Sequence, residues 1–129
     1  MRVFIETPRW SFTKYGISEG MLEKEYVSPL PTLFNYGFVI GTKAADGMEE
    51  DAIVLGKTLK QGQTVEVREV GVVRFRDGGL EDDKLVMSSG VGAGFVDRAM
   101  INVFFTVYAV FKTLRSGKKC AYEGVEFRR

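Results

Sequence analysis

The chain has 129 residues, of which 45% are hydrophobic and 27% are charged, and its formal net charge is +1. This length suits one domain with a single core, and the balanced charge excludes a general attraction to nucleic acid or to a membrane surface. Histidine is absent and Cys120 is the only cysteine, which excludes imidazole-based catalysis, histidine zinc sites, an intrachain disulfide and a cysteine cluster.

We therefore expect a single domain over residues 1–129 whose chemistry depends on carboxylates, lysines, tyrosines and a bound metal. The first ten residues lack the apolar core of a signal peptide, and polar residues interrupt the longest apolar stretch before it could span a bilayer. These features predict a cytoplasmic protein with no membrane partner.

Most of the predicted elements are short strands. Alternating residues over 2–6 predict an opening strand that ends before Pro8, and further β-branched runs bounded by turns predict a compact antiparallel set. The valines of the run from Thr64 to Phe75 change phase, which predicts a bulge near Glu69 and Gly71. Such a bend lets a small sheet curl into a barrel. The remaining predicted strands cover residues 36–40, 52–55, 64–68, 70–75 and 85–87.

Residues 96–115 change to a helical period. Apolar residues recur at spacings of three and four, and the predicted helix ends at Ser116-Gly117. Its wide apolar arc fits either the core alone or the core together with a neighbouring subunit. Cys120 is expected to pack as a small apolar residue in a last strand over 120–127.

Two acidic loops carry the candidate metal ligands. Asp46 and Asp51 belong to one loop, and Asp77 and Asp82 belong to the other. Carboxylates gathered at one place repel one another, so such a cluster requires cations, and oxygen ligands favour magnesium, calcium or manganese. Asp-Gly is also a common turn dipeptide, so a role in turns alone is the alternative for these aspartates.

Other motifs predict no function. Gly56-Lys57-Thr58 lacks the upstream glycine of a phosphate-binding loop, and the glycines over 90–94 lack the rest of a dinucleotide fingerprint. Basic residues over 57–76 alternate with glutamates, which is typical of a solvated face. We therefore expect no nucleic-acid partner, although exposed aromatics such as Trp10 could stack on bases.

Five segments together resemble the soluble magnesium-dependent inorganic pyrophosphatases. They occur in family order with nearly family spacing, and they include FNYGFVIGT, DGMEEDAIVL and VGVVRFRDGGLEDDKLV. The resemblance implies a mainly β fold with a flanking helix (α+β), in which a five-stranded barrel of the oligonucleotide/oligosaccharide-binding kind forms the centre. The segments cover residues 6–15, 34–42, 46–55, 70–86 and 111–124.

The resemblance also implies roles for individual residues. The substrate would be pyrophosphate or another phosphorylated small molecule. The cofactor would be magnesium, with manganese as the alternative. The chain would form a homo-oligomer, which is expected to be a hexamer. Catalysis would involve Asp51, Glu49 and Tyr36. The metal would be held by Asp46, Asp51, Asp77, Asp82 and Glu6, and the substrate by Lys14, Lys24, Tyr36, Lys84 and Lys112.

Five positions depart from the family pattern, and at one of them Glu49 replaces a proline. Met48 replaces the aspartate that orients or deprotonates the attacking water, and methionine cannot accept a proton. Gly16 replaces a glutamate, Lys24 an arginine and Phe111 a tyrosine. We expect slow magnesium-dependent hydrolysis, with Glu49 or metal coordination alone activating the water. The alternative is a catalytically impaired relative that binds metal and a phosphorylated ligand, or acts as an assembly subunit.

Overall fold

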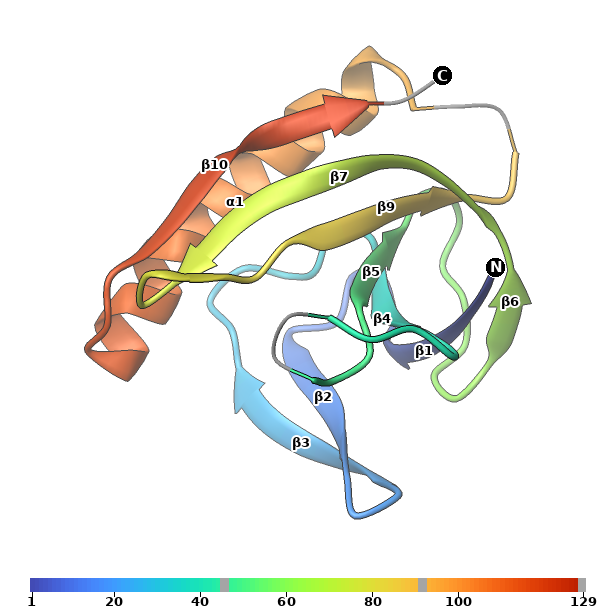
Figure 1. The fold of residues 1–129 in the computed structure, drawn as a ribbon, viewed down its shortest axis with the longest axis horizontal. Coiled ribbons are helices and arrows are strands. Elements are labelled where there is room, and N and C mark those ends of the chain that lie inside the picture. The colour runs from blue at the N-terminus through green and yellow to red at the C-terminus, as the bar shows by residue number, and fades with distance from the viewer. Residues whose placement is uncertain (45–46, 91–92, 128–129) are drawn as a thin grey trace.

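The structure, a computed structural model, describes residues 1–44, 47–90 and 93–127. Within these residues, eight strands form one sheet, two strands form a separate hairpin, and one helix packs against the sheet (Figure 1). The elements are β1 (Arg2–Thr7), β2 (Thr13–Ser18), β3 (Met21–Val27), β4 (Asn35–Val39), β5 (Asp51–Val54), β6 (Thr64–Glu66), β7 (Arg68–Asp77), β8 (Leu80–Glu81), β9 (Lys84–Ser88), α1 (Phe95–Ser116) and β10 (Cys120–Phe127).

The large sheet curls into a five-stranded barrel because one long strand bends. The sheet order is β10-β7-β9-β5-β4-β1-β6, and β6 and β7 are separated only by Val67. β6 pairs with β1 and β7 pairs with β9, so this continuous stretch closes the barrel. The β7–β9 register shifts between Glu69 and Gly71, which confirms the predicted bulge. The mainly β fold with a flanking helix is likewise confirmed.

Two hydrophobic clusters form the core. One fills the barrel and includes Val3, Val39 and Val54, while the other lies between the barrel and α1 and includes Phe75 and Phe105. α1 runs along β10 and β7 in Figure 1 and ends where Gly117 adopts a left-handed conformation, as predicted. No helix in the described ranges combines the length and hydropathy that crossing a bilayer requires.

The expectation of an entirely antiparallel set of strands is wrong at one place. β5 and β9 pair in parallel, because the chain leaves β5 and passes through β6, β7 and β8 before it returns alongside. A parallel pair needs such a long crossover, which local patterns do not reveal. The consequence for the site is direct, since the first residues of β5 and β9 lie at the same edge.

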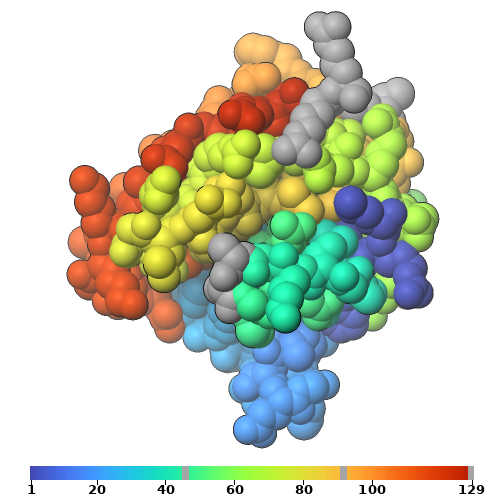
Figure 2. Space-filling model, in the orientation of Figure 1, coloured from blue at the N-terminus to red at the C-terminus, as the bar shows by residue number. Residues whose placement is uncertain are grey.

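The hairpin β2–β3 was not predicted from the sequence. It projects from the barrel in Figures 1 and 2, and most of its residues are half-buried or exposed, so it lacks a clear apolar face. The signal that could have identified it is Glu19-Gly20, a two-residue turn in which both residues have positive φ, 52° and 78°. This hairpin carries Lys14 to the site.

Candidate functional site

A buried lysine lies at the centre of the candidate site. Lys84 begins β9, and only 2% of its side chain is exposed. Its Nζ lies 3.0 Å from Oδ2 of Asp51, the first residue of β5, and 2.8 Å from Oδ2 of Asp82. A buried ammonium needs such partners, because an unpaired charge in the interior is costly. The parallel pairing of β5 and β9 therefore determines where these carboxylates meet.

Lys112 of α1 extends this arrangement toward the helix. Its Nζ lies 3.0 Å from Oδ2 of Asp77, at the end of β7, and 3.5 Å from Oδ2 of Asp82. The hydrogen bond from Lys112 is the largest influence on Asp77 and keeps the pKa of that carboxyl below its ordinary value. Burial acts to lower the pKa of Lys112, but Tyr108 and the two aspartates outweigh burial and raise it. Three aspartates and two lysines thus alternate across the site.

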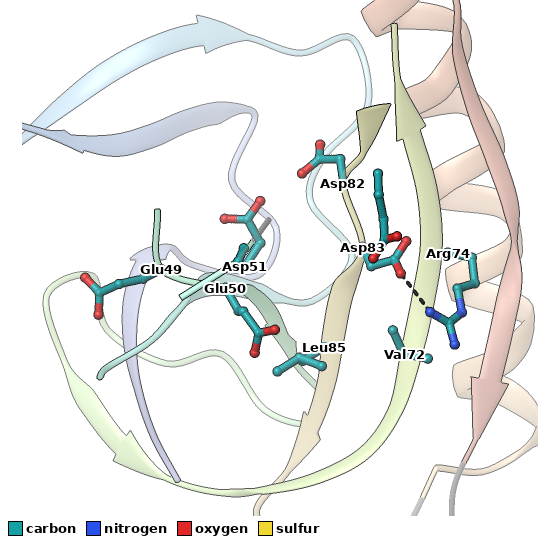
Figure 3. A pocket seen from close by; sticks show the side chains of 10 residues that line it. Glu49, Glu50, Asp51, Val72, Arg74, Asp82, Asp83 and Leu85 are labelled. Atoms are coloured by element: carbon teal, nitrogen blue, oxygen red, sulfur yellow. Dashed lines mark hydrogen bonds and ion pairs between the residues drawn. The ribbon is translucent and has the colours of Figure 1, made fainter. Parts of the chain in front are cut away.

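Asp51 and Asp82 also border an acidic hollow of about 200 Å³. Their carboxylates point toward the same space in Figure 3, whereas the neighbouring Asp83 turns to Arg74, with which it forms an ion pair of 2.8 Å. The side chains of Asp51 and Asp82 are 39% and 25% exposed, so both are open to an ion or ligand from solvent.

Glu6 lies beside Asp51 in a second hollow of about 150 Å³, which Met48 also lines. Its Oε2 accepts a hydrogen bond of 3.1 Å from the backbone N–H of Ile17. Burial raises the pKa of the Glu6 carboxyl to about 7; the Ile17 bond opposes that shift, and Asp51 adds to it. Glu6 can therefore gain or lose a proton near neutrality, while Met48 offers this hollow no proton acceptor.

Tyr36 brings a buried hydroxyl to the site. Only 4% of the residue is exposed, and its Oη has no hydrogen-bond partner among the described residues. Burial, followed by the charge of Asp51, holds the pKa of Tyr36 well above its ordinary value, so the hydroxyl keeps its proton. Lys14 Nζ lies 4.4 Å from the centre of the same ring. A hydroxyl that is buried without a partner is available to donate to a bound ligand.

A third hollow, which we call the basic cavity, lies between α1 and the hairpin. Its volume is about 170 Å³, and Lys14 and Lys112 line it together with two tyrosines, Tyr26 and Tyr108. Burial acts to raise the pKa of Tyr108, but Lys14, Lys112 and Lys84 outweigh burial and lower it. The complete lining consists of Lys14, Glu25, Tyr26, Tyr108, Phe111, Lys112, Arg115 and Ser116.

Gly16 makes room for a carboxylate from the adjacent strand. A Cβ at position 16 would overlap Oε1 of Glu25, so the glutamate of β3 occupies the space that a larger residue in β2 would need. The sequence comparison noted only that a glutamate is missing at position 16. The structure instead places a carboxylate there from Glu25, a residue that sequence reasoning assigned no role.

The structure brings most of the predicted site residues together, with three exceptions. Lys24 is exposed and is not among the residues that line the three hollows. Glu49 lines the acidic hollow and the hollow beside Glu6, but its carboxylate accepts a bond of 3.1 Å from the N–H of Gly41, and in Figure 3 its side chain points away from Asp82. Asp46 lies outside the described residues. The residues that do converge are Glu6, Lys14, Tyr36, Asp51, Asp77, Asp82, Lys84 and Lys112.

The donor set fits a hard divalent cation by charge and by atom type. Oxygen atoms of Asp51 and Asp82 already surround one cation, the ammonium of Lys84, and oxygen ligands are those that magnesium prefers. Within the ranges that the structure describes, no group of three Asp, Glu, His or Cys side chains is arranged to hold a metal ion. Asp51 and Asp82, with Asp77 beside them, are the residues that could hold a divalent metal ion.

Comparison with known proteins is consistent with this chemistry. Residues 3–91 match the family model described as inorganic pyrophosphatase. The inorganic pyrophosphatases of Saccharolobus solfataricus and Gluconobacter oxydans are 34% and 30% identical to the chain over 91 residues, which are 67% of this chain and 53% of each relative. The chain thus spans about half the length of the curated relatives it matches.

Solved structures resemble nearly the whole chain. An inorganic pyrophosphatase from Helicobacter pylori superposes with a TM-score of 0.86 at 26% identity, covering 99% of this chain and 84% of that one. The enzyme from Thermus thermophilus gives 0.84 at 25% identity, with 99% and 82% covered. The likeness therefore includes α1 and β10, which lie beyond the match to the family model.

Proposed function

The chain belongs to the inorganic pyrophosphatase family, and on that premise we propose that it hydrolyses pyrophosphate to two phosphate ions with bound magnesium. The observation that carries this proposal is the alternation of Asp51, Lys84, Asp82, Lys112 and Asp77, with hydrogen-bonding distances from each lysine to its aspartates. This arrangement offers oxygen ligands to a metal and ammonium groups to a phosphoryl group at the same place. Manganese is the alternative metal, since it takes the same ligands.

In the proposed reaction the oxygen of a water attacks one phosphorus, and the bond from that phosphorus to the bridging oxygen breaks. The bridging oxygen leaves with the second phosphate and takes up a proton. Magnesium would supply Lewis-acid polarisation of the phosphoryl oxygens and a lower pKa for the water. Lys14 and Lys112 would balance the charge that develops on the phosphates, and the unpartnered hydroxyl of Tyr36 would donate to a phosphoryl oxygen.

The proton of the attacking water needs an acceptor other than Met48. Asp51 and Glu6 border the same hollow as Met48, and the raised pKa of Glu6, about 7, suits reversible proton uptake. Glu49 would first have to leave the N–H of Gly41. We therefore propose that the carboxylate of Asp51 or Glu6 accepts the proton of the attacking water. We expect slower turnover than an aspartate at position 48 would support.

Phosphate release from pyrophosphate in millimolar magnesium tests the proposal. We expect release by the wild-type chain that stops when the metal is chelated and returns when magnesium is restored. A chain that binds magnesium and pyrophosphate without releasing phosphate would contradict the hydrolytic function.

Met48 favours a second candidate function. Because this side chain has no proton acceptor, the same site could bind metal and a phosphorylated ligand without hydrolysing it. Calorimetric binding of pyrophosphate with no phosphate release would favour that function over hydrolysis. The two candidates share their ligands and differ only in whether the water is activated.

We also propose that the chain forms a homo-oligomer in the cytoplasm, with a hexamer expected from the family. On α1 the residues Val103, Val107, Val110 and Leu114 recur at spacings of four, three and four, and they are 57%, 39%, 58% and 80% exposed. An apolar stripe of this kind is typical of a helix that packs against another chain.

Sedimentation velocity at micromolar concentration tests the assembly. We expect the wild type to sediment as an oligomer and a Val110→Lys/Leu114→Lys variant as a smaller species, because two charges would have to be buried in the interface. Val27→Lys is the matched control, since Val27 is 61% exposed but lies on the projecting hairpin. A monomeric wild type would contradict the assembly proposal.

A further inference from the structure

Arg115, in the last turn of α1, presents hydrogen-bond donors to the basic cavity that the protein itself scarcely uses. Its guanidinium carbon lies 4.6 Å from the ring centre of Tyr26, and its Nη2 donates one long bond of 3.4 Å to the backbone oxygen of Glu25. No ion pair joins Arg115 to a carboxylate among the described residues. Because a guanidinium carries five N–H donors, most of its hydrogen-bonding capacity is available to a ligand.

The cavity that Arg115 borders gathers positive charge. The Nζ atoms of Lys14 and Lys112 lie 5.5 and 5.6 Å from the centre of the Tyr108 ring, so both ammonium groups flank one wall. Lys14 likewise forms no ion pair within the described part of the chain. Three cations and a single carboxylate, that of Glu25, therefore line about 170 Å³. This volume is several times the roughly 30 Å³ that one water occupies, so a tetrahedral oxyanion has room.

Stacking against Tyr26 gives Arg115 a defined orientation. A guanidinium that lies over an aromatic ring uses its flat face for the ring, and its N–H groups extend from the edges in the same plane. Those edges are the part that binds two phosphate oxygens at once. Arg115 can therefore contact the Tyr26 ring and bind an anion at the same time. The contact with the ring also restricts the Arg115 side chain before the anion binds.

We propose that Arg115 is an anion-binding residue that, with Lys14 and Lys112, holds one phosphoryl group of the substrate in the basic cavity. This inference rests on the proposed function for the identity of the substrate, and on the geometry of the cavity for the binding itself. Arg115 would take the place in substrate binding that the resemblance suggested for Lys24, which is exposed and is not among the residues that line the cavity. The resemblance assigned no role to Arg115, although it placed Lys112 of the same helix in substrate binding.

The test is calorimetric titration of inorganic phosphate into the full chain, without pyrophosphate, for the wild type, Arg115→Gln and Arg98→Gln. Arg98 is a matched control because it lies on the same helix and stacks on Phe127 in the same manner, at 4.7 Å, outside the basic cavity. We expect Arg115→Gln to weaken phosphate binding about tenfold, as loss of a charge-assisted bond does. Arg98→Gln should stay within about twofold of the wild type.

A purely structural role for Arg115 would give a different pattern. It would lower the melting temperature in phosphate-free buffer and leave phosphate affinity unchanged in the folded protein. Arg115→Lys also distinguishes anion binding from a structural role, and it replaces Arg115→Gln in the test if that variant does not fold. It keeps the charge but loses the planar pair of donors, so we expect about threefold weaker phosphate binding.

Equal phosphate affinity in wild type, Arg115→Gln and Arg115→Lys would overturn the inference, and so would a wild type that does not bind phosphate. A wild type that binds phosphate through Arg115 but releases none from pyrophosphate would support it. Phosphate binding without release of phosphate from pyrophosphate would contradict the hydrolytic function, not the role of Arg115. The anion-binding role of Arg115 and the proposed hydrolysis of pyrophosphate are therefore contradicted by different outcomes.

Discussion

Replacing Asp82 by asparagine is expected to abolish most pyrophosphate hydrolysis, lowering kcat/KM by a factor of about 10² to 10³. Among the described residues, Asp82 is the one carboxylate that pairs with both lysines, with Oδ2 2.8 Å from Lys84 Nζ and 3.5 Å from Lys112 Nζ. The amide would remove a charged metal ligand, and a loss of about 3–4 kcal/mol of transition-state stabilisation corresponds to that factor. Initial rates of phosphate release across a magnesium titration provide the measurement.

Asp83→Asn is the matched control for this variant. Asp83 is the next residue, its side chain is 17% exposed, and it is also in an ion pair, but its partner is Arg74, toward which its carboxylate points in Figure 3. We expect both variants to lose about 1–3 kcal/mol of stability, because each leaves a cation with fewer partners. Only Asp82→Asn should lose activity. Comparable activity losses in the two variants would mean that stability, rather than metal binding, explains the effect.

Replacing Met48 by aspartate is expected to raise the rate of hydrolysis by a factor of about 10² to 10⁴, the usual contribution of a general base. Met48 is 66% exposed and borders the hollow that also contains Glu6 and Asp51. A shorter carboxylate side chain fits at such an exposed position without disturbing the core. Values of kcat at saturating magnesium for the wild type and Met48→Asp decide the question.

Met48→Asn controls for the change of size and polarity, since asparagine has the shape of aspartate without its basicity. We expect no gain in that variant. If Met48→Asp is no faster than the wild type, the water is already activated by other groups, and Glu6, Glu49 and Asp51 are the carboxylates that line the same hollow. If only Met48→Asp is active, the chain carries an intact metal site whose catalysis has been lost, and the ligand-binding function becomes the better account.

Local patterns predicted the elements whose burial follows a regular period. The helix over 96–115 agrees with α1 at Phe95–Ser116, and the phase change near Glu69 and Gly71 agrees with the bulge that bends β7. The hairpin β2–β3 escaped prediction because its strands lie outside the core and have no alternation of buried and exposed residues to detect. Sequence periodicity therefore predicted the elements in which position along the strand or helix decides whether a residue is buried.

The site was predicted in part for a different reason. The motif resemblance pointed to Asp51, Asp77 and Asp82, and these aspartates do converge, on two lysines. Lys24, to which the resemblance assigned substrate binding, is exposed and does not line the basic cavity, whereas Arg115, which was assigned no role, does. A motif records which residue type stands at each position, but it does not record which strand or helix supplies a charge to a cavity.

The sequence by itself determined the chemical inventory of this protein and the periods of its strands and helix. Without histidine and with one cysteine, the charged groups available to a site are carboxylates, ammonium groups and guanidinium groups. The tertiary structure alone decided which of them meet. The parallel β5–β9 pair sets Asp51 and Lys84 together across 33 residues, and Glu25 fills the space that Gly16 leaves open. The reason is physical, because burial, ion pairing and pKa depend on distance through space, and closure of the barrel sets those distances.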